Sequence, residues 1–238
     1  MRKRLVFACL AVLLIWPSSS VWGAAELFFA GYQWQVKDGY DYPGKNYWSS
    51  RQAWVDEAGD LHLRLEKRGL WYCAEVISRE YFSYGSFSFQ VVGELDRLDP
   101  QVVLGLFLYH PSSLEEVDVE MARWGKAQNP NGLFGLYRQE RHAAQPFQFS
   151  LPEGSYSTYR IEWLPEQLRF TGQYGHRSDE EAIFARWRYP QKPVLGEALF
   201  ERRYLQVRMN LWLYGGRQPQ NGKNVEVVIH DFQYRPWP

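Results

Sequence analysis

The fold of this chain is decided by one continuous apolar stretch, Val102-Val103-Leu104-Gly105-Leu106-Phe107-Leu108-Tyr109. An unbroken apolar run of this length predicts a β-strand that is covered on both faces. The sequence on either side of it repeats the strand signal and shows little sign of helix.

Alternation of apolar and polar residues predicts further strands. Leu61, Leu63 and Leu65 alternate with polar residues, as a half-buried strand requires. By the same reasoning we expect strands at residues 87–91, 159–163, 168–170, 205–213 and 225–234. Turn signals such as Asn129-Pro130-Asn131-Gly132 and Gly215-Gly216 separate them. Many short strands at this spacing predict an all-β fold, an antiparallel β-sandwich or barrel, in a single domain.

The segment that follows the apolar stretch carries three acids on one face of a predicted strand. In Glu115-Glu116-Val117-Asp118-Val119-Glu120, alternation places the two valines on one side and Glu116, Asp118 and Glu120 on the other. Like charges destabilise a sheet, and no basic residue falls between them. Crowded carboxylates cannot all ionise easily, so we expect at least one raised pKa. The alternative is a solvated strand face whose acids only aid solubility.

The spacing of the two glutamates suits the hydrolysis of a glycosidic bond. This reaction needs one ionised carboxylate and one acid that is still protonated near neutral pH. On a strand, Glu116 and Glu120 have Cα atoms roughly 13 Å apart, and side chains that lean inward can bring the carboxyl groups to about 5–6 Å. A carboxyl separation of about 5–5.5 Å is typical of a retaining, double-displacement mechanism. Asp118 is placed to share a proton or a hydrogen bond between them.

Composition excludes several other classes of function. The formal net charge is zero, which argues against a nucleic-acid partner. The five histidines have no zinc-ligand spacing, and there is neither a Gly-x-Gly-x-x-Gly motif nor a P-loop. Aromatic residues make up 17% of the chain. Most should pack in a sandwich core, but flat rings also stack on sugars, so a carbohydrate cleft would use the surplus.

The start of the chain has the pattern of a secretory signal peptide. Residues 2–4 are basic, residues 5–16 are apolar, and the small residues Gly23 and Ala24 follow. We expect residues 1–24 to be removed and residues 25–238 to form one soluble, monomeric domain that is secreted or periplasmic and has no membrane attachment after cleavage. An uncleaved anchor is the alternative, although the apolar run is shorter than the roughly twenty residues of a membrane span. Cleavage leaves Cys73 without a disulfide partner.

Five segments around the acids occur in an order that is specific to one family. They are Trp34-x-x-Lys37-Asp38-Gly39-Tyr40, Cys73-Ala74-Glu75 with Tyr84-Gly85-x-Phe87, Phe107-Leu108-Tyr109, Tyr156-Ser157-Thr158-Tyr159-Arg160-Ile161-Glu162-Trp163-x-Pro165, and Met209-Asn210-Leu211-Trp212. Together with the acids, over about residues 32–234, they resemble glycoside hydrolase family 16, which includes the lichenases and laminarinases. The resemblance implies a concanavalin A-like jelly roll of two curved sheets, with the acids on the concave sheet.

The resemblance also implies a role for each acid and a set of binding residues. Glu116 matches the nucleophile, Glu120 the general acid/base and Asp118 the assisting acid, and no cofactor is needed for catalysis. Matches to the sugar-binding cleft are Glu75, Tyr109, Tyr137, Asn210 and Trp212. For Glu75 the alternative is a surface acid, and for Trp212 it is core packing.

Two further features follow from the family. A structural calcium ion on the convex face would be bound by Asp231 and the carbonyl of Gly59. Trp48 stands where lichenases have the cysteine that pairs with the residue at Cys73, so that disulfide is lost. We therefore expect a retaining endo-β-glucanase that hydrolyses O-glycosidic bonds of a polysaccharide or oligosaccharide. The alternatives are a transglycosylase with the same covalent intermediate and a lectin-like glucan-binding module without turnover.

Overall fold

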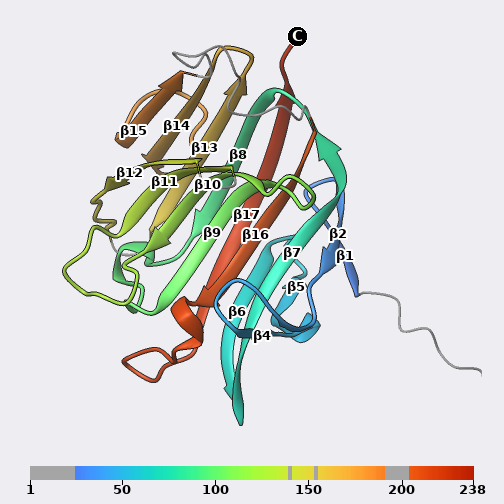
Figure 1. Ribbon diagram of the computed structural model, residues 1–238, viewed down its shortest axis with the longest axis vertical. Coiled ribbons are helices and arrows are strands. Elements are labelled where there is room, and N and C mark those ends of the chain that lie inside the picture. The colour runs from blue at the N-terminus through green and yellow to red at the C-terminus, as the bar shows by residue number, and fades with distance from the viewer. Residues whose placement is uncertain (1–24, 139–140, 153–154, 191–203) are drawn as a thin grey trace, which may run out of the picture.

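The computed structural model describes residues 25–138, 141–152, 155–190 and 204–238, and these ranges are almost entirely β-strand. The strands form two layers (Figure 1). The first sheet contains, in spatial order, β1 (Glu26–Phe29), β2 (Tyr32–Val36), β7 (Leu70–Phe82), β16 (Leu205–Leu213), β9 (Val102–His110), β10 (Glu115–Ala122), β11 (Gly132–Arg138) and β12 (Arg141–Phe147).

The second sheet lies behind the first in Figure 1. It contains, in spatial order, β5 (Ala53–Val55), β6 (Leu61–Arg68), β17 (Val225–Pro236), β8 (Gly85–Val92), β13 (Tyr156–Leu164), β14 (Gln167–Tyr174) and β15 (Ile183–Pro190). The short strands β3 (Gly39–Asp41) and β4 (Asn46–Trp48) adjoin β7, and the 3₁₀ turns are η1 (Ser50–Gln52), η2 (Leu95–Arg97) and η3 (Tyr214–Gly216). Within the described ranges, β4 with β7 is the one parallel pair.

This arrangement confirms the predicted antiparallel β-sandwich of jelly-roll type. The predicted strand at 205–213 coincides with β16, and the decisive apolar stretch forms most of β9. β9 is buried on both faces from Val102 to Leu108, as its unbroken apolar sequence predicts. No helix in the described parts of the chain is long and apolar enough to cross a membrane.

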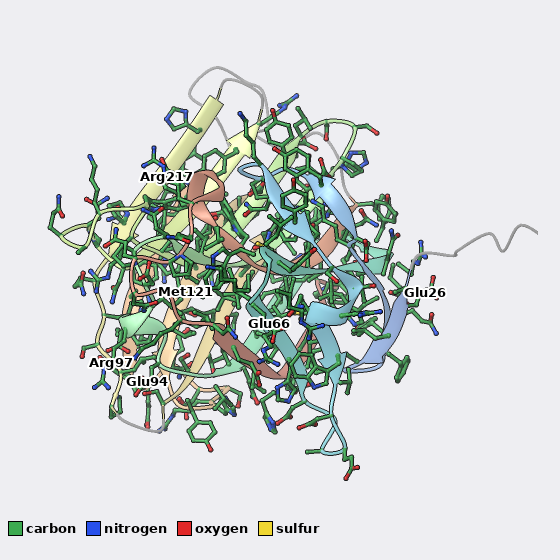
Figure 2. All side chains as sticks on the ribbon, turned by 90° about the horizontal axis from the view of Figure 1, so that it is seen from below. Glu26, Glu66, Glu94, Arg97, Met121 and Arg217 are labelled. Atoms are coloured by element: carbon green, nitrogen blue, oxygen red, sulfur yellow. The ribbon has the colours of Figure 1, made fainter. Side chains whose placement is uncertain are left out.

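The hydrophobic core lies between the two sheets. Leu61, Leu63 and Leu65 on β6 are fully buried, as are Phe87 and Phe89 on β8. Complete burial of a side chain of this kind contributes roughly 1.5–3 kcal/mol of transfer free energy. In Figure 2 the side chains fill the space between the layers, with Met121 inside and Glu26, Glu94 and Arg97 at the periphery.

Cys73 and Trp48 are neighbours at the edge of the first sheet. They pair in register between β7 and β4, so a tryptophan does stand beside the cysteine, as expected. Both side chains are buried. The Cys73 thiol donates to Asn46 Oδ1 at 3.4 Å, and burial raises its pKa to about 12. Cys73 is therefore a packed core residue.

Candidate active site

The three acids of β10 lie on the outer face of the first sheet. Val117 and Val119, which alternate with them, belong to the hydrophobic core. The predicted division of this strand into an apolar face and an acidic face is therefore confirmed.

The strands on either side of β10 set the neighbours of each acid. Residues paired in register project to the same face of a sheet. Glu116 is paired with Tyr109 and Tyr137, Asp118 with Phe107 and Gly135, and Glu120 with Gly105 and Leu133. One strand further away, Arg208 on β16 is paired with Phe107, and Asn210 with Gly105. The acids therefore share their face with aromatic and polar side chains from β9, β11 and β16.

These side chains surround a cleft of about 360 Å³. Six of its lining residues are ones that the sequence predicts, namely Glu75, Tyr109, Glu116, Glu120, Asn210 and Trp212. Asp118 lies beneath the surface with 1% exposure, between the two glutamates on the strand. Tyr137 lies beside Glu116 on β11 but is not part of the lining in the described structure.

Burial governs the protonation of the acid trio. Burial is the largest effect on Glu116 and raises its pKa to about 7, and the charge of Glu75 acts in the same direction. A hydrogen bond with Asp118 and the charge of Arg208 lower this pKa. Burial is also the main cause that holds the pKa of Glu120 well above its ordinary value, with a contribution from the charge of Glu116. The raised pKa values agree with the expectation for this cluster, but their largest cause is burial and not the crowding of charges from which they were predicted.

Asp118 is the most enclosed of the three acids. Burial, followed by the charges of Glu120 and Glu116, raises its pKa well above the ordinary range. A hydrogen bond from the backbone of Gly135 opposes this rise in pKa, and the other hydrogen-bonding neighbour of the Asp118 carboxyl group is the carboxyl group of Glu116. A contact between two carboxyl groups is a hydrogen bond only when one of them holds a proton. Asp118 is therefore suited to keep a proton and to present it to Glu116.

Two glycines make room for this arrangement. A Cβ atom on Gly135 would lie 2.1 Å from Oδ1 of Asp118, and a Cβ atom on Gly105 would lie 2.6 Å from Oδ1 of Asn210. Both distances are far below van der Waals contact, so any larger residue would displace the polar side chain. The absence of a side chain at these two positions lets Asp118 and Asn210 pack directly against the neighbouring backbone.

Glu75 occupies a different electrostatic environment from the trio. Its side chain is 2% exposed and forms ion pairs with Lys37 at 3.3 Å and with Arg208 at 3.2 Å. Lys37 also pairs with Asp41 at 3.2 Å, and the Arg208 guanidinium lies 4.5 Å from the centre of the Tyr109 ring. Glu75 therefore lines the cleft as predicted, but both of its oxygens are already bonded to cations. Its role in sugar binding stays a prediction.

Sequence reasoning missed half of the residues that line the cleft: Lys37, Asp41, Tyr42, Pro43, Phe107 and Arg208. Two of them had an available signal. Arg208 is two residues before Asn210, and Phe107 is two residues before Tyr109, so strand alternation places each on the same face as a predicted site residue. The other four come from the irregular region around β3, where no periodicity exists.

Of the two predicted calcium ligands, Gly59 lies in the turn before β6 and Asp231 lies on β17. Ile229 is paired with Leu61, but β17 has an irregular register between Ile229 and Asp231, so the strand pairing does not place Asp231 opposite Gly59. Asp231 already accepts a hydrogen bond from Gln233 at 2.7 Å. Calcium takes about six to eight oxygen ligands, and the described residues contain no group of three or more His, Cys, Asp or Glu side chains that could hold a metal ion. These two residues alone do not fit calcium, and the ion stays a prediction.

Comparison with known proteins places this chain in a family. A family model described as glycosyl hydrolases family 16 matches residues 43–198. A β-glucanase of Bacillus licheniformis has a similar structure, with a TM-score of 0.59 and 18% identity over 89% of this chain and 97% of that one. A β-1,3-glucanase from Mycobacterium marinum gives a TM-score of 0.67 with 14% identity over 85% and 90% of the two chains.

A third similar structure carries a different description. It is called an immunostimulatory antigen and pseudo β-1,3-glucanase of Mycobacterium tuberculosis, with a TM-score of 0.64 and 17% identity over 83% of this chain and 88% of that one. No curated protein sequence matches this chain significantly. At these identities the structural likeness establishes the fold, while the family rests on the sequence match.

Proposed function

The chain belongs to glycosyl hydrolase family 16, and from this premise we propose that it is a retaining endo-β-glucanase with Glu116 as nucleophile and Glu120 as general acid/base. One observation carries the proposal. Both glutamates line the same cleft from a single strand, and burial raises the pKa of each. Double displacement requires one protonated and one ionised carboxyl group. The raised pKa of Glu120 keeps its proton in place, and Glu116, with a pKa of about 7, is ionised in a substantial fraction of molecules near neutral pH.

The proposed reaction proceeds in two steps. Ionised Glu116 attacks the anomeric carbon while Glu120 gives its proton to the departing glycosidic oxygen, so that one C–O bond forms as another breaks. Glu120, now ionised, then takes a proton from water, and the resulting hydroxide releases the sugar from Glu116. Asp118 holds a hydrogen bond to Glu116 and so supports the ionised form before attack.

The remaining cleft residues support binding of a sugar chain. Trp212 and Tyr109 offer ring faces, and rings of this kind pack against apolar sugar surfaces. Asn210 lines the same cleft, and in this proposal its side-chain amide forms a hydrogen bond with a sugar hydroxyl. Since the substrate is a polymer outside the cell in this proposal, we also propose that residues 1–24 direct export and that the mature chain is secreted or periplasmic.

The proposal is tested with a panel of polysaccharides that covers mixed-linkage β-glucan, laminarin, xyloglucan, agarose and carrageenan. We expect new reducing ends from a β-glucan, and NMR of the fresh product should show the β-anomer first. An initial α-product would contradict double displacement, and no release from any polymer would contradict hydrolysis. Longer products at high oligosaccharide concentration would show transfer to a sugar acceptor, which is the transglycosylase alternative.

A second candidate function is glucan binding without turnover. It is favoured by the pseudo β-1,3-glucanase of M. tuberculosis, whose description shows that a similar fold is found without that activity. It has no need for three buried acids on one strand, and for this reason we rank hydrolysis above it. Measurable glucan binding together with no reducing-end release from any polymer would support this candidate.

A further inference from the structure

A second pocket, of about 230 Å³, lies on the outer face of the second sheet. Phe87, Phe89 and Val91 of β8 point into the core, so the residues that alternate with them face outward. The pocket is lined by Ser86, Ser88, Gln90, Arg160, His176, Arg177, Ser178, Gln233 and Arg235. The cleft lies on the outer face of the other sheet, so the two concavities are on opposite sides of the sandwich.

Short side chains form the floor of this pocket and longer ones form its walls. Ser88 on β8 is paired with Arg160 on β13 and with Gln233 on β17. Ser86 is paired with Arg235 in the next outward-facing row. Neighbouring strands are about 4.8 Å apart, so the two walls stand roughly 10 Å apart across the serines. A trough of this width suits one sugar ring with a charged substituent.

The charge of the pocket is not neutralised by its own lining. In the described parts of the chain, Arg160 donates only to the carbonyl of Arg177 at 3.3 Å, and Arg235 only to the side-chain oxygen of Gln233 at 3.4 Å. Neither guanidinium has a carboxylate partner there. Two acids share this face. Asp231 on β17 accepts from Gln233, and Glu162 on β13, which is paired with Ser86, contacts Arg169 at 3.8 Å. Two arginines therefore keep most of their donor capacity for something outside the protein.

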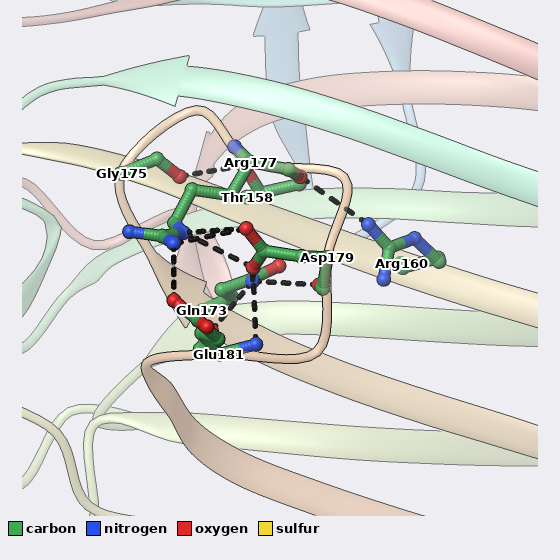
Figure 3. Close-up of polar contacts among 7 residues, drawn as sticks. All are labelled: Thr158, Arg160, Gln173, Gly175, Arg177, Asp179 and Glu181. Carbon is green, nitrogen blue, oxygen red and sulfur yellow. Dashed lines mark hydrogen bonds and ion pairs between the residues drawn. The ribbon is translucent and has the colours of Figure 1, made fainter.

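The wall on the β13 side is held in place by a hydrogen-bonded loop (Figure 3). Thr158 donates to the carbonyl of Gly175 at 2.7 Å and accepts from the backbone N–H of Arg177 at 3.2 Å. The Arg177 side chain is neutralised by Asp179 and Glu181, at 2.9 and 2.7 Å. Arg160 is therefore braced against a formed loop, and less conformational entropy is lost when a ligand binds.

We propose that this pocket binds an oxyanion group, a sulfate ester or a carboxylate, carried by an acidic polysaccharide. Planar guanidinium groups match such oxyanions with two parallel hydrogen bonds, and the serine hydroxyls and glutamine amides add further donors. Among the described residues, the lining contains no Phe, Tyr or Trp, whereas the cleft has Phe107, Tyr109 and Trp212. The second pocket therefore recognises a charged group, whereas the cleft offers aromatic ring faces. Binding of a ligand in the second pocket does not depend on the proposed hydrolysis.

Binding to the full chain tests the proposal directly. Fluorescently labelled fragments of dextran sulfate, polygalacturonate and neutral dextran of matched length are titrated with protein, with inorganic sulfate as competitor. We expect at least one acidic fragment to bind and the neutral one not to bind. Equal binding of the neutral fragment, or no binding of either acidic fragment, would overturn the proposal. If free sulfate binds in the pocket and no acidic fragment displaces it, the pocket does not bind a polysaccharide.

Matched charge variants locate the site. Arg160→Gln and Arg235→Gln should each weaken binding of the acidic fragment at least about tenfold, because each removes a charge-assisted hydrogen bond. Arg188→Gln removes the same charge from an exposed position on β15, outside the pocket, and should change binding less than about twofold. Equal losses in all three variants would show general charge attraction and refute a built site. Unaltered melting temperatures and unaltered glucan turnover in Arg160→Gln separate this result from loss of folding and from the cleft.

Discussion

Two groups of acids that are closely spaced in the sequence of this molecule behave in opposite ways. Glu116, Asp118 and Glu120 on β10 are buried, and burial raises their pKa values. Asp179 and Glu181, in the loop after β14, are exposed and pair with Arg177, whose hydrogen bond lowers the pKa of Asp179 (Figure 3). Crowding of acids alone therefore does not determine their protonation. What differs is access to water and to a cation.

The cation that acts on the pKa of Glu116 explains how the environment of the trio is maintained. Arg208 lies on the same face as Asp118, with Phe107 between them in register. Its guanidinium bonds to Glu75 at 3.2 Å and covers the Tyr109 ring. It therefore lowers the pKa of Glu116 from a distance but does not neutralise the trio. The loop shows the opposite arrangement, in which the arginine bonds directly to the acids.

Turnover should show the largest difference between substitutions in the buried acids of β10 and substitutions in the exposed acids of the loop. Glu116→Gln and Glu120→Gln should each reduce hydrolysis of the best β-glucan by roughly 10³-fold or more, because the nucleophile or the proton donor is lost. Asp179→Asn, an equivalent change in the exposed group, should leave turnover within about twofold. Initial rates of reducing-end release measure this, with melting curves to check folding. Near-normal turnover in either glutamine variant would remove that residue from its role.

The pH dependence of the rate should follow the raised pKa of Glu116. Because the nucleophile must be ionised, kcat/KM should rise as pH increases toward about 7, with roughly a tenfold change for each pH unit below that value. It should fall again at higher pH, when Glu120 loses its proton. Assays from pH 4 to 10 measure both limbs. A rate already at its plateau at pH 5 would contradict the burial of Glu116.

The buried acids of β10 and the exposed acids of the loop should change the free energy of unfolding in opposite directions as pH rises. The pKa of Glu116 is about 7 in the folded chain and 4.5 ordinarily, so its contribution is fully present below pH 4.5 and is lost as pH rises through about 7. The difference corresponds to about 3 kcal/mol at most. Urea unfolding at pH 5 and pH 8 measures it. Glu116→Gln should reduce the pH dependence in this window, and an unaltered dependence in that variant would contradict the prediction.

A single methyl group should disturb the buried trio. Gly135→Ala places a Cβ atom 2.1 Å from Oδ1 of Asp118, so we expect a loss of about 1–3 kcal/mol in unfolding free energy and slower turnover. Adding Asp118→Ala to this variant removes the clashing oxygen and should recover part of the stability. Additive effects of the two substitutions in urea unfolding would show that they do not interact.

The smallest effect should come from the exposed acids. The lowered pKa of Asp179 means that its contribution is present above pH 3.8 and is lost as pH falls through the folded-state value. Solvent screens this pair, so Asp179→Asn should lower the melting temperature only slightly at pH 6 and even less at pH 3. A larger loss at pH 3 than at pH 6 would reverse the expected sign.

The sequence predicts much of this fold because its strands have clear periods. Leu61, Leu63 and Leu65 are buried as alternation requires, and the same rule separates the acids of β10 from its valines. Alternation assigns a face to each residue but does not say which strands lie side by side. For this reason Arg208 was missed, although it lies on a predicted strand: its contact with Glu75 depends on the pairing of β16 with β7.

Lys37 and Asp41 could not be predicted in the same way. They lie at and before β3, a strand of three exposed residues with no apolar periodicity. Their contribution to the cleft depends on where an irregular segment crosses the sheet, which is determined by tertiary contacts such as the Lys37–Glu75 pair. On regular strands most of the lining residues were recognised, with Arg208 and Phe107 as the exceptions, and on the irregular segment none were.

The buried thiol of Cys73 has a practical consequence. With a pKa of about 12 and a tryptophan beside it, this group reacts with an alkylating reagent only when β4 separates from β7. Lys37 and Glu75, two cleft residues, belong to the same edge of the sheet. The rate of alkylation therefore reports how often the cleft wall opens, and a sugar chain held in the cleft should slow that rate without any engineered label.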